Sequence, residues 1–376
     1  MFHRGVALRE TADTAAALDA LTNYANAYPH GKYASKAKHL ESACLTALGR
    51  HAEARKILEA LAGEKNASDS VLYDLAWAQK RANDEPAAIA TYQRLIKENP
   101  DSKLTVASQA ELAELLVRAG KPAEAIPLLE KVTANRDADA KIRALAMALL
   151  GTAYKDDGKP EKALAAFAAY AKEFPDDRYA ADALLQAGET ATAMRDFPAA
   201  QKSFADFIRR FPGHAQAPLA QLKLAEAQAD AGQFDDSLAT HEGFLKDHAK
   251  DALAYRAHFG AGWALQNLKK YDRARVEYEK AIAGTNTETA ARAQFQIGET
   301  YCDENNFEKA VPALLAVVDV YAYPKWSARA LLEAGRASEH LNQPDRAKQY
   351  YGDVMSKYKA QTDEVKVAEE RLKAMK

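Results

Sequence analysis

Nine histidines are spread along the sequence, and no two stand four residues apart, the spacing at which two histidines on one helix would hold a metal ion. His241 and His248 are seven residues apart and would share a helix face, but surface or packing histidines are much the commoner outcome. Motifs of serine hydrolases, phosphate loops, zinc proteases and calcium loops are missing from the sequence. The sequence therefore predicts neither an enzyme nor a metal or cofactor site.

Adjacent aspartates could supply carboxylates for acid–base chemistry, and they occur as three pairs: Asp156 and Asp157, Asp176 and Asp177, and Asp235 and Asp236. All three pairs fall at expected turns, where aspartates more often cap helices. The two cysteines, Cys44 and Cys302, are far apart in the sequence and form no CxxC pair, so we expect both to be reduced and packed.

The charge balance indicates which partners to exclude. The chain has 51 lysines and arginines against 53 aspartates and glutamates, a net charge of −2. A nucleic-acid surface or a membrane-surface patch would usually carry a basic excess. The longest apolar stretch, Ala144 to Tyr154, is far shorter than the roughly 20 residues of a membrane span, so direct membrane insertion is not expected.

An internal repeat organises the whole sequence. Similar turn segments precede a helix that contains alanine, and the segments begin at Gly49, Asn83, Gly120, Gly158, Arg195, Gly232, Lys269, Asn305 and Asn342. Subtracting successive starts gives 34, 37, 38, 37, 37, 37, 36 and 37 residues. A period of this size predicts an array of supersecondary units.

Each unit reads as two helices joined by a tight turn. Glycine and asparagine tolerate the left-handed conformation that ends a helix, and they begin most of the turn segments. The second helix carries large apolar residues four and seven positions after the alanine, such as Phe204 and Phe207, which places them on one face. Many second helices end in an aromatic residue and proline, such as Phe211 and Pro212, and proline stops the helix there.

These units resemble tetratricopeptide repeats. With the alanine as repeat position 20, the eight positions of the family pattern in the unit from Ala181 are Leu184, Ala187, Gly188, Ala191, Ala200, Phe204, Phe207 and Pro212. Six of them match, while alanine replaces the family's leucine at position 7 and its tyrosine at position 11. The resemblance implies an all-α, right-handed superhelical solenoid of about ten repeats. Several units depart from the pattern at position 4, with Lys38, Gln109, Gln221, His258 and Gln294, and we expect those units to pack less tightly.

The repeat register predicts one array over residues 1–362 and a C-terminal capping helix over 363–376. The expected repeats lie near 1–34, 35–68, 69–105, 106–143, 144–180, 181–217, 218–254, 255–290, 291–327 and 328–362. In this register the first repeat starts inside its first helix, and we favour an excised domain of a longer protein over a clipped repeat.

The resemblance also implies that first helices line a concave groove through repeat positions 2, 5, 9 and 12. Two patches of residues typical of binding hot spots fall at those positions. The first is Tyr73 with Trp77. The second contains Phe259, Trp263 and Phe295 beside a row of Arg256, Arg292, Arg329 and Arg336, which suits a carboxylate-bearing peptide. The alternative is that the aromatic residues pack between repeats and the arginines pair with Glu226 and Glu299.

The sequence thus predicts a scaffold that binds a protein or peptide segment in its groove. The lysine and asparagine of the family's carboxylate clamp for chaperone tails are missing at positions 5 and 9. The aromatic-proline endings resemble a bacterial subtype found in Tol–Pal-associated and outer-membrane-assembly proteins, which implies the periplasm or cell envelope, with the cytoplasm as the alternative. Two other functions remain open: a structural array acting by self-association as a homo-oligomer, and the recognition domain of a larger enzyme or sensor chain.

Overall fold

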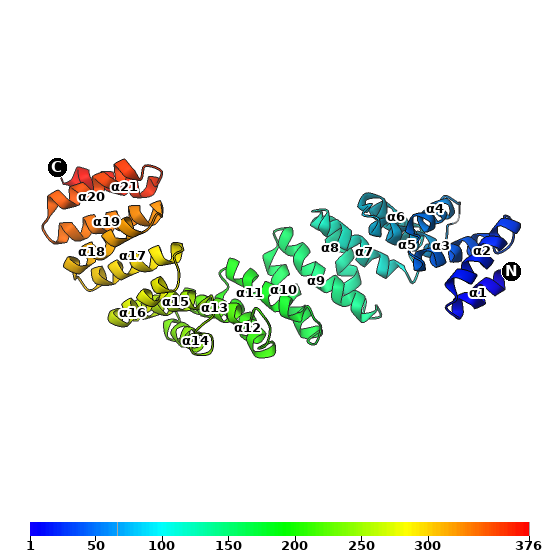
Figure 1. Cartoon of the computed structure of the whole chain (residues 1–376), viewed down its shortest axis with the longest axis horizontal. Helices are drawn as coiled ribbons and strands as arrows, with labels where there is room; N and C mark the ends of the chain where they lie inside the picture. The colour runs from blue at the N-terminus through cyan, green and yellow to red at the C-terminus, as the bar shows by residue number, and fades with distance from the viewer. Residues whose placement is uncertain (66, 376) are drawn as a thin grey trace. The chain divides into compact units, whose positions relative to one another are not determined.

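The computed structural model describes residues 1–65 and 67–375, and within them the chain forms 21 α-helices and no strand (Figure 1). The first ten helices are α1 (Phe2–Glu10), α2 (Thr14–Ala27), α3 (Ala34–Ala47), α4 (His51–Ala62), α5 (Asp69–Arg81), α6 (Glu85–Glu98), α7 (Thr105–Arg118), α8 (Pro122–Ala134), α9 (Ala140–Asp156) and α10 (Pro160–Glu173). The all-α fold expected from the repeats is confirmed.

The remaining helices, like the first ten, are joined by alternating shorter and longer connections. They are α11 (Ala180–Ala193), α12 (Phe197–Arg210), α13 (Ala217–Asp230), α14 (Phe234–Asp247), α15 (Ala254–Asn267), α16 (Tyr271–Ala283), α17 (Glu288–Asp303), α18 (Phe307–Val320), α19 (Pro324–His340), α20 (Pro344–Lys357) and α21 (Thr362–Ala374). In the described chain no helix is both long and apolar enough to cross a membrane.

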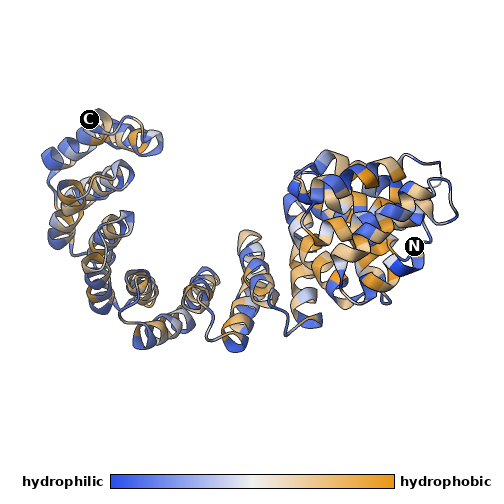
Figure 2. Ribbon diagram, turned by 45° about the vertical axis from the view of Figure 1, so that its right-hand side comes forward, coloured by the Kyte–Doolittle hydropathy of each residue, from blue (hydrophilic) through white to orange (hydrophobic). Residues whose placement is uncertain are grey.

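The chain forms two compact units, Met1–Ala183 and Leu184–Lys376, and the boundary falls inside α11. Within each unit every helix packs chiefly on the helices next to it in the chain, and first helices also touch the first helix of the next pair, as α13 touches α15 and α15 touches α17. Hydrophobic and hydrophilic residues occur together on the helices (Figure 2), as expected where each helix buries one face.

The turns between paired helices all use one backbone conformation. Among the described residues ten have positive φ: Ala12, Gly49, Asn83, Gly120, Gly158, Arg195, Gly232, Lys269, Asn305 and Asn342. Nine of them are the residues with which the sequence-derived turn segments begin. The repeat signal therefore reports a backbone requirement, a left-handed residue after each first helix.

Close packing within each pair depends on small residues. The residue at repeat position 20 is fully buried in every pair: it is alanine in nine, from Ala17 to Ala347, and Ser237 in the tenth. At position 8, a Cβ on Gly188 would stand 2.5 Å from Cε1 of Phe204, and a Cβ on Gly298 would stand 2.5 Å from Cδ2 of Leu314. Real side chains do not approach so closely, so these glycines set the distance between the two helices of a pair.

Three of the five polar residues at repeat position 4 form hydrogen bonds inside their own pair. Each of these three reaches the second helix at the residue nineteen positions later. Gln221 donates to the carbonyl of Thr240 (3.4 Å), the His258 ring is 2.7 Å from Glu277, and Gln294 donates to the carbonyl of Ala313 (2.9 Å). Hydrogen bonds thus replace the apolar contact that the family pattern has there.

The C-terminal helix α21 packs its thin apolar stripe on the last pair. Ala368 is fully buried, and Val367, Leu372 and Met375 lie partly buried against the cluster that contains Tyr351. Arg329 of α19 and Glu364 of α21 also form an ion pair, with 3.1 Å between nitrogen and oxygen.

The first prediction contrasts two helical glycines of the second unit. Gly298→Ala should destabilise the α17–α18 pair by about 1–3 kcal/mol, because its Cβ would overlap Leu314. Gly352→Ala should stabilise α20 by about 0.5–1 kcal/mol, since no atom lies within 4 Å of its Cβ and alanine favours helix. Hydrogen exchange of each helix measures both effects, and a common sign for the two variants would contradict the packing role.

A second prediction concerns the left-handed turns. Lys269 has φ of 58° and carries a side chain where other turns have glycine. Lys269→Gly should therefore stabilise the α15–α16 turn by about 1 kcal/mol, and Gly232→Ala should destabilise the α13–α14 turn by a similar amount. Urea unfolding followed by local amide exchange compares them; a loss of stability in Lys269→Gly would show that the lysine side chain itself stabilises the turn.

Candidate partner-binding site

A pocket in the second unit opens between the first helices of three successive pairs. Its volume is about 340 Å³. Arg256, Phe259, Gly260 and Trp263 of α15 line it because spacings of three and four residues place them on one helix face. Glu226, Ala229 and Asp230 of α13, Thr289 and Arg292 of α17, and His241 of α14 complete the lining.

Four of the sequence-predicted site residues, Arg256, Phe259, Trp263 and Arg292, thus lie together. The Arg256 guanidinium pairs with Glu226 (2.8 Å), which the alternative interpretation from sequence anticipated. The exposed Arg292 guanidinium lies 4.5 Å from the centre of the Phe259 ring and forms no ion pair within the described residues. A cation over an aromatic face keeps its charge available to an anion.

The base of the pocket is formed by a glycine and a histidine. A Cβ on Gly260 would overlap the His241 ring, with Cδ2 at 2.8 Å and Nε2 and Cε1 closer still. The Nε2 edge of the ring therefore lies directly beneath Gly260. His241 is 2% exposed, and its Nδ1 has no hydrogen-bond partner.

Burial holds His241 in its neutral form. Loss of hydration is the main cause and the positive charge of Arg256 the smaller one, and together they lower the pKa of His241 to about 4. An unpaired polar nitrogen in the interior is costly, so its presence beside a pocket is a candidate functional feature.

The other predicted residues of the C-terminal patch lie elsewhere. Phe295 is 7% exposed and packs its ring 5.5 Å from that of Trp326, so it contributes to the core and offers no surface to a partner. Arg329 pairs with Glu364 of α21, and Arg336 pairs with Glu333 at 2.5 Å. Of the four predicted arginines, Arg256 and Arg292 line this pocket, whereas Arg329 pairs with a carboxylate of α21 and Arg336 with one on its own helix.

The aromatic pair of the first unit is also divided. Trp77 lines a separate pocket of about 460 Å³, where the Arg81 guanidinium lies 4.3 Å from the indole centre. Tyr73, four residues earlier on α5, instead places its ring 6.0 Å from the buried Tyr92 ring. The two side chains share a helix, but Tyr73 does not line the pocket that Trp77 lines.

The remaining sequence candidates for chemistry are accounted for by packing. His248 lies against Phe244, and no described group of three or more histidines, cysteines and acidic residues could hold a metal ion. Asp177 accepts hydrogen bonds from the Tyr170 hydroxyl (2.6 Å) and the Tyr179 amide, and these bonds lower the pKa of Asp177. Asp235 and Asp236 lie in the first turn of α14, where a helix dipole favours negative charge.

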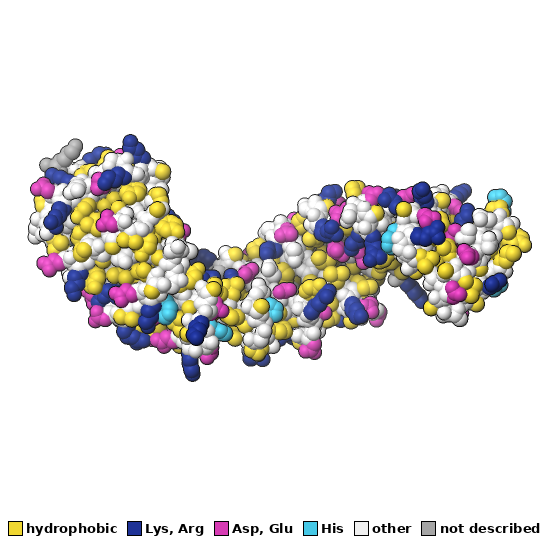
Figure 3. Space-filling view, viewed as in Figure 1, with side chains coloured by type: hydrophobic (Ala, Val, Ile, Leu, Met, Phe, Trp, Pro, Cys, Tyr) yellow, Lys and Arg dark blue, Asp and Glu magenta, His cyan; other side chains and the backbone are white. Residues whose placement is uncertain are grey.

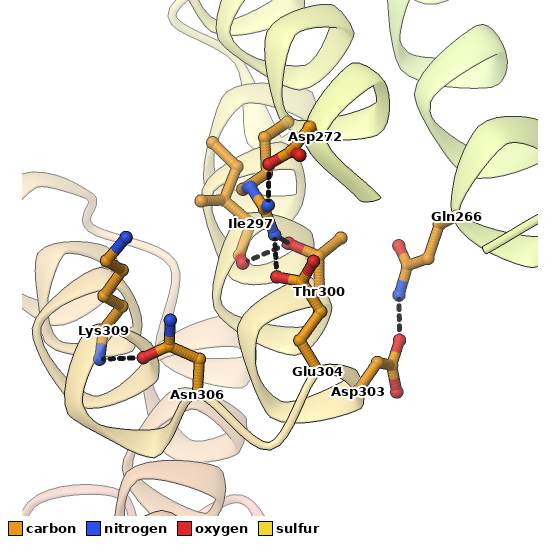
Figure 4. A network of polar contacts seen from close by, with 9 residues as sticks. Gln266, Asp272, Ile297, Thr300, Asp303, Glu304, Asn306 and Lys309 are labelled. Atoms are coloured by element: carbon orange, nitrogen blue, oxygen red, sulfur yellow. Dashed lines mark hydrogen bonds and ion pairs between the residues drawn. The ribbon is translucent and has the colours of Figure 1, made fainter. Parts of the chain in front are cut away.

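A polar network holds the pocket helices in place (Figure 4). The buried Arg275 of α16 donates to Thr300 of α17 (3.3 Å) and to Glu304, the residue that follows α17 (2.7 Å), and it also pairs with Asp272. Its guanidinium lies 4.3 Å from the Tyr301 ring centre. Gln266 at the end of α15 donates to Asp303 of α17 (3.1 Å), so α15, α16 and α17 are joined by directed contacts as well as by apolar packing.

Apolar side chains also gather over α17, α18 and α19 on the face shown in Figure 3. They adjoin the core cluster of Phe295, Leu314 and Trp326. Val320, at the end of α18, is 69% exposed.

His241 and Gly260 are the pocket residues that the predicted site does not include. Both residues could have been found in the sequence, because both differ from the residue types that the other repeats have at the same position. His241 stands at position 24, where the other nine pairs have Leu21, Leu58, Tyr92, Leu129, Phe167, Phe204, Tyr278, Leu314 and Tyr351. Gly260 stands at position 6, where the neighbouring repeats have Lys223 and Gln296.

The fold and pocket define the class of protein as a helical-repeat array with a polar-rimmed groove pocket. Comparison with family models agrees. A tetratricopeptide repeat-like domain matches residues 152–298, a tetratricopeptide repeat matches 329–360, and a domain of unknown function (DUF7017) matches 37–173. The chain therefore contains tetratricopeptide-like domains, and proteins built on such scaffolds are generally not catalysts. No curated protein sequence matches it.

Solved structures show the same fold at low identity. The structure of Naa15/Naa10 bound to HypK-THB has 14% identity and a TM-score of 0.51, and the match covers 100% of this chain and 63% of that one. The apo form of RapI has 11% identity, a TM-score of 0.50 and coverages of 80% and 94%. A signal transduction ATPase with a tetratricopeptide repeat sensor from Pyrococcus horikoshii has 17% identity, a TM-score of 0.50 and coverages of 92% and 55%.

A carboxylate near the second unit's groove makes stability depend on pH. Burial first, and then the nearby charges of Glu333 and Asp303, raise the pKa of Glu299 to about 7 against the opposing effect of Arg336. The folded-state pKa is thus well above the ordinary value of 4.5. The group's contribution to stability is complete below that value and is lost as pH rises through about 7.

Glu299→Gln should therefore stabilise the second unit at about pH 8 by roughly 1–3 kcal/mol and change little at about pH 4. Thermal unfolding at both pH values measures the difference. The exposed Glu279→Gln serves as the matched control, and we expect no pH-dependent change there. An equal effect of Glu299→Gln at both pH values would rule out its titration as the cause.

Proposed function

We propose that the chain is an interaction scaffold that binds a peptide or protein segment in the groove of its second unit, at the pocket between α13, α15 and α17. Tetratricopeptide-type repeats generally mediate protein–protein interaction, and this class of repeat matches most of the second unit. The observation that carries the proposal is the convergence of Arg256, Phe259, Trp263 and Arg292 on one pocket.

The chemistry of that pocket suits a segment with both apolar and acidic groups. Arginine and tryptophan are the side chains most enriched in binding hot spots. Trp263 and Phe259 supply apolar area, while Arg292 supplies a positive charge that no described carboxylate neutralises by an ion pair. A carboxylate-bearing partner segment is therefore part of the proposal.

The bacterial envelope role and the envelope location remain predictions from the repeat subtype. They would make the bound segment part of an envelope complex. The pocket itself is independent of the compartment, since its lining residues belong to adjoining repeats of one unit.

The proposal is tested by selecting binders from a random peptide library with the full chain. Peptides retained by the unaltered protein should lose at least tenfold in affinity for the Arg256→Glu, Arg292→Glu double variant, because both cations at the rim are reversed. Fluorescence anisotropy of the labelled peptides measures the change.

Arg273→Glu is the matched control, since Arg273 lies on α16, pairs with Glu242 and does not line the pocket. It should keep the affinity of the unaltered protein. Equal binding by the double variant, or a library that yields no binder, would contradict the proposed site.

A further inference from the structure

The pair α13–α14 departs from the other pairs in the way it fills its interior. Position 24 elsewhere holds a large side chain that is at most 3% exposed, such as Phe204 or Tyr278. Here it holds His241, while position 20 has Ser237, whose hydroxyl donates to the carbonyl of Ala225 (2.8 Å). This pair is therefore polar at both positions, where the others have alanine at position 20 and leucine, phenylalanine or tyrosine at position 24.

Gly260 leaves this polar interior open to the pocket. Any side chain at position 260 would overlap the His241 ring. The other nine pairs all carry a side chain at this repeat position: His3, Leu40, Asp74, Glu111, Leu149, Gln186, Lys223, Gln296 and Glu333. His241 lines the pocket and is 2% exposed, and its Nε2 edge lies against Gly260, where no side chain of that residue separates the ring from the pocket.

The charges around the pocket balance before any ligand enters. Glu226 and Asp230 of α13 oppose Arg256 of α15 and Arg292 of α17, and His241 is neutral. On α14 itself Glu242 pairs with Arg273 of α16. An entering monoanion together with a proton on His241 would keep the pocket neutral, whereas a dianion such as phosphate would add charge beside two carboxylates.

We propose that this pocket binds a single carboxylate of a partner peptide, with His241 as the buried group that hydrogen-bonds it at the base and Arg256 and Arg292 as the cations at the rim. This inference rests on the proposed function and names the partner's chemistry at the same site. Phe259 and Trp263 beside the rim take the apolar side chain that carries or adjoins the carboxylate.

Binding is linked to proton uptake. In the free protein burial and Arg256 keep His241 neutral. A carboxylate at Nε2 replaces lost hydration and attracts the proton, which raises the pKa of His241 in the complex. Because the complex then holds more protons than the free protein, the affinity for the carboxylate increases as the pH falls from about 8 to about 6.

The first experiment uses N-acetyl-L-phenylalanine and the full chain. This probe places one carboxylate beside one aromatic ring, and its uncharged analogue N-acetyl-L-phenylalaninamide is the control. We expect a Kd of about 1 mM for the acid and no measurable binding of the amide. The C-terminal amide of N-acetyl-Phe-Glu tests whether a side-chain carboxylate can replace the C-terminal carboxylate. Inorganic phosphate tests whether the pocket binds a dianion.

Two substitutions separate chemistry from packing. In another pair of this array Leu129 at position 24 is fully buried opposite Ala113 at position 8, which shows that leucine fits there. His241→Leu should therefore be accommodated in the same way. It should lose at least tenfold in affinity for the acid. His241→Gln keeps a polar group at the base and should retain most of the affinity, but both variants should lose the pH dependence, which a purely structural role would not change.

Nuclear magnetic resonance of ¹³C-labelled histidine provides the direct readout. The His241 signal, assigned by its loss in His241→Gln, should titrate well below pH 6 alone and above it with the acid bound. The inference is overturned if the amide binds as well as the acid, if neither carboxylate probe binds, if phosphate binds more tightly, or if His241→Leu is unaffected. Library peptides that still bind through Arg256 and Arg292 in His241→Leu would leave the proposed function intact while refuting the role of His241.

Discussion

The contact between a small residue on one helix and a large residue on its partner determines the rest of this structure. Glycine at position 8 lets a ring or a leucine lie almost against the helix backbone, as Gly188 does for Phe204 and Gly298 for Leu314. Alanine at position 20 closes the other side of the same interface with no exposed surface. Two helices held this close leave no room to slide, so the pair becomes a rigid unit that can be stacked.

Rigid stacking explains where a binding pocket can arise. The first helices of successive pairs touch lightly, and groove side chains reach across between them. Where those side chains are complementary they close the groove, as Lys80 does by binding Glu111 and Glu114 at 2.7 and 2.8 Å. Between α13 and α15 the glycine at position 260 removes such a side chain, and the groove deepens to the buried His241.

The sequence predicts the features that every repeat must have and misses those that depend on a particular neighbour. The turns are predictable because a left-handed backbone favours the same residue types each time, and Gly49 and Asn305 mark it plainly. Arg256 and Trp263 are predictable because groove positions follow from helix periodicity. Arg329 and Phe295 are not, because a carboxylate on α21 and a tryptophan on α19 decide their surroundings.

An unpaired buried nitrogen would be an unusual feature for packing alone to retain. Leu129 shows that the same position can be filled by a side chain with no polar atom to desolvate. In an array the cost of such a residue stays local, because each pair is stabilised mainly by its own interface and its neighbours. The pairs on either side have fully buried aromatic side chains at position 24, Phe204 and Tyr278. The array can therefore tolerate polar residues inside α13–α14, whereas the same residues would destabilise a single compact core as a whole. The repeat architecture thus separates stability from recognition, and it allows one pair to carry a buried histidine beside a pocket without weakening the pairs around it.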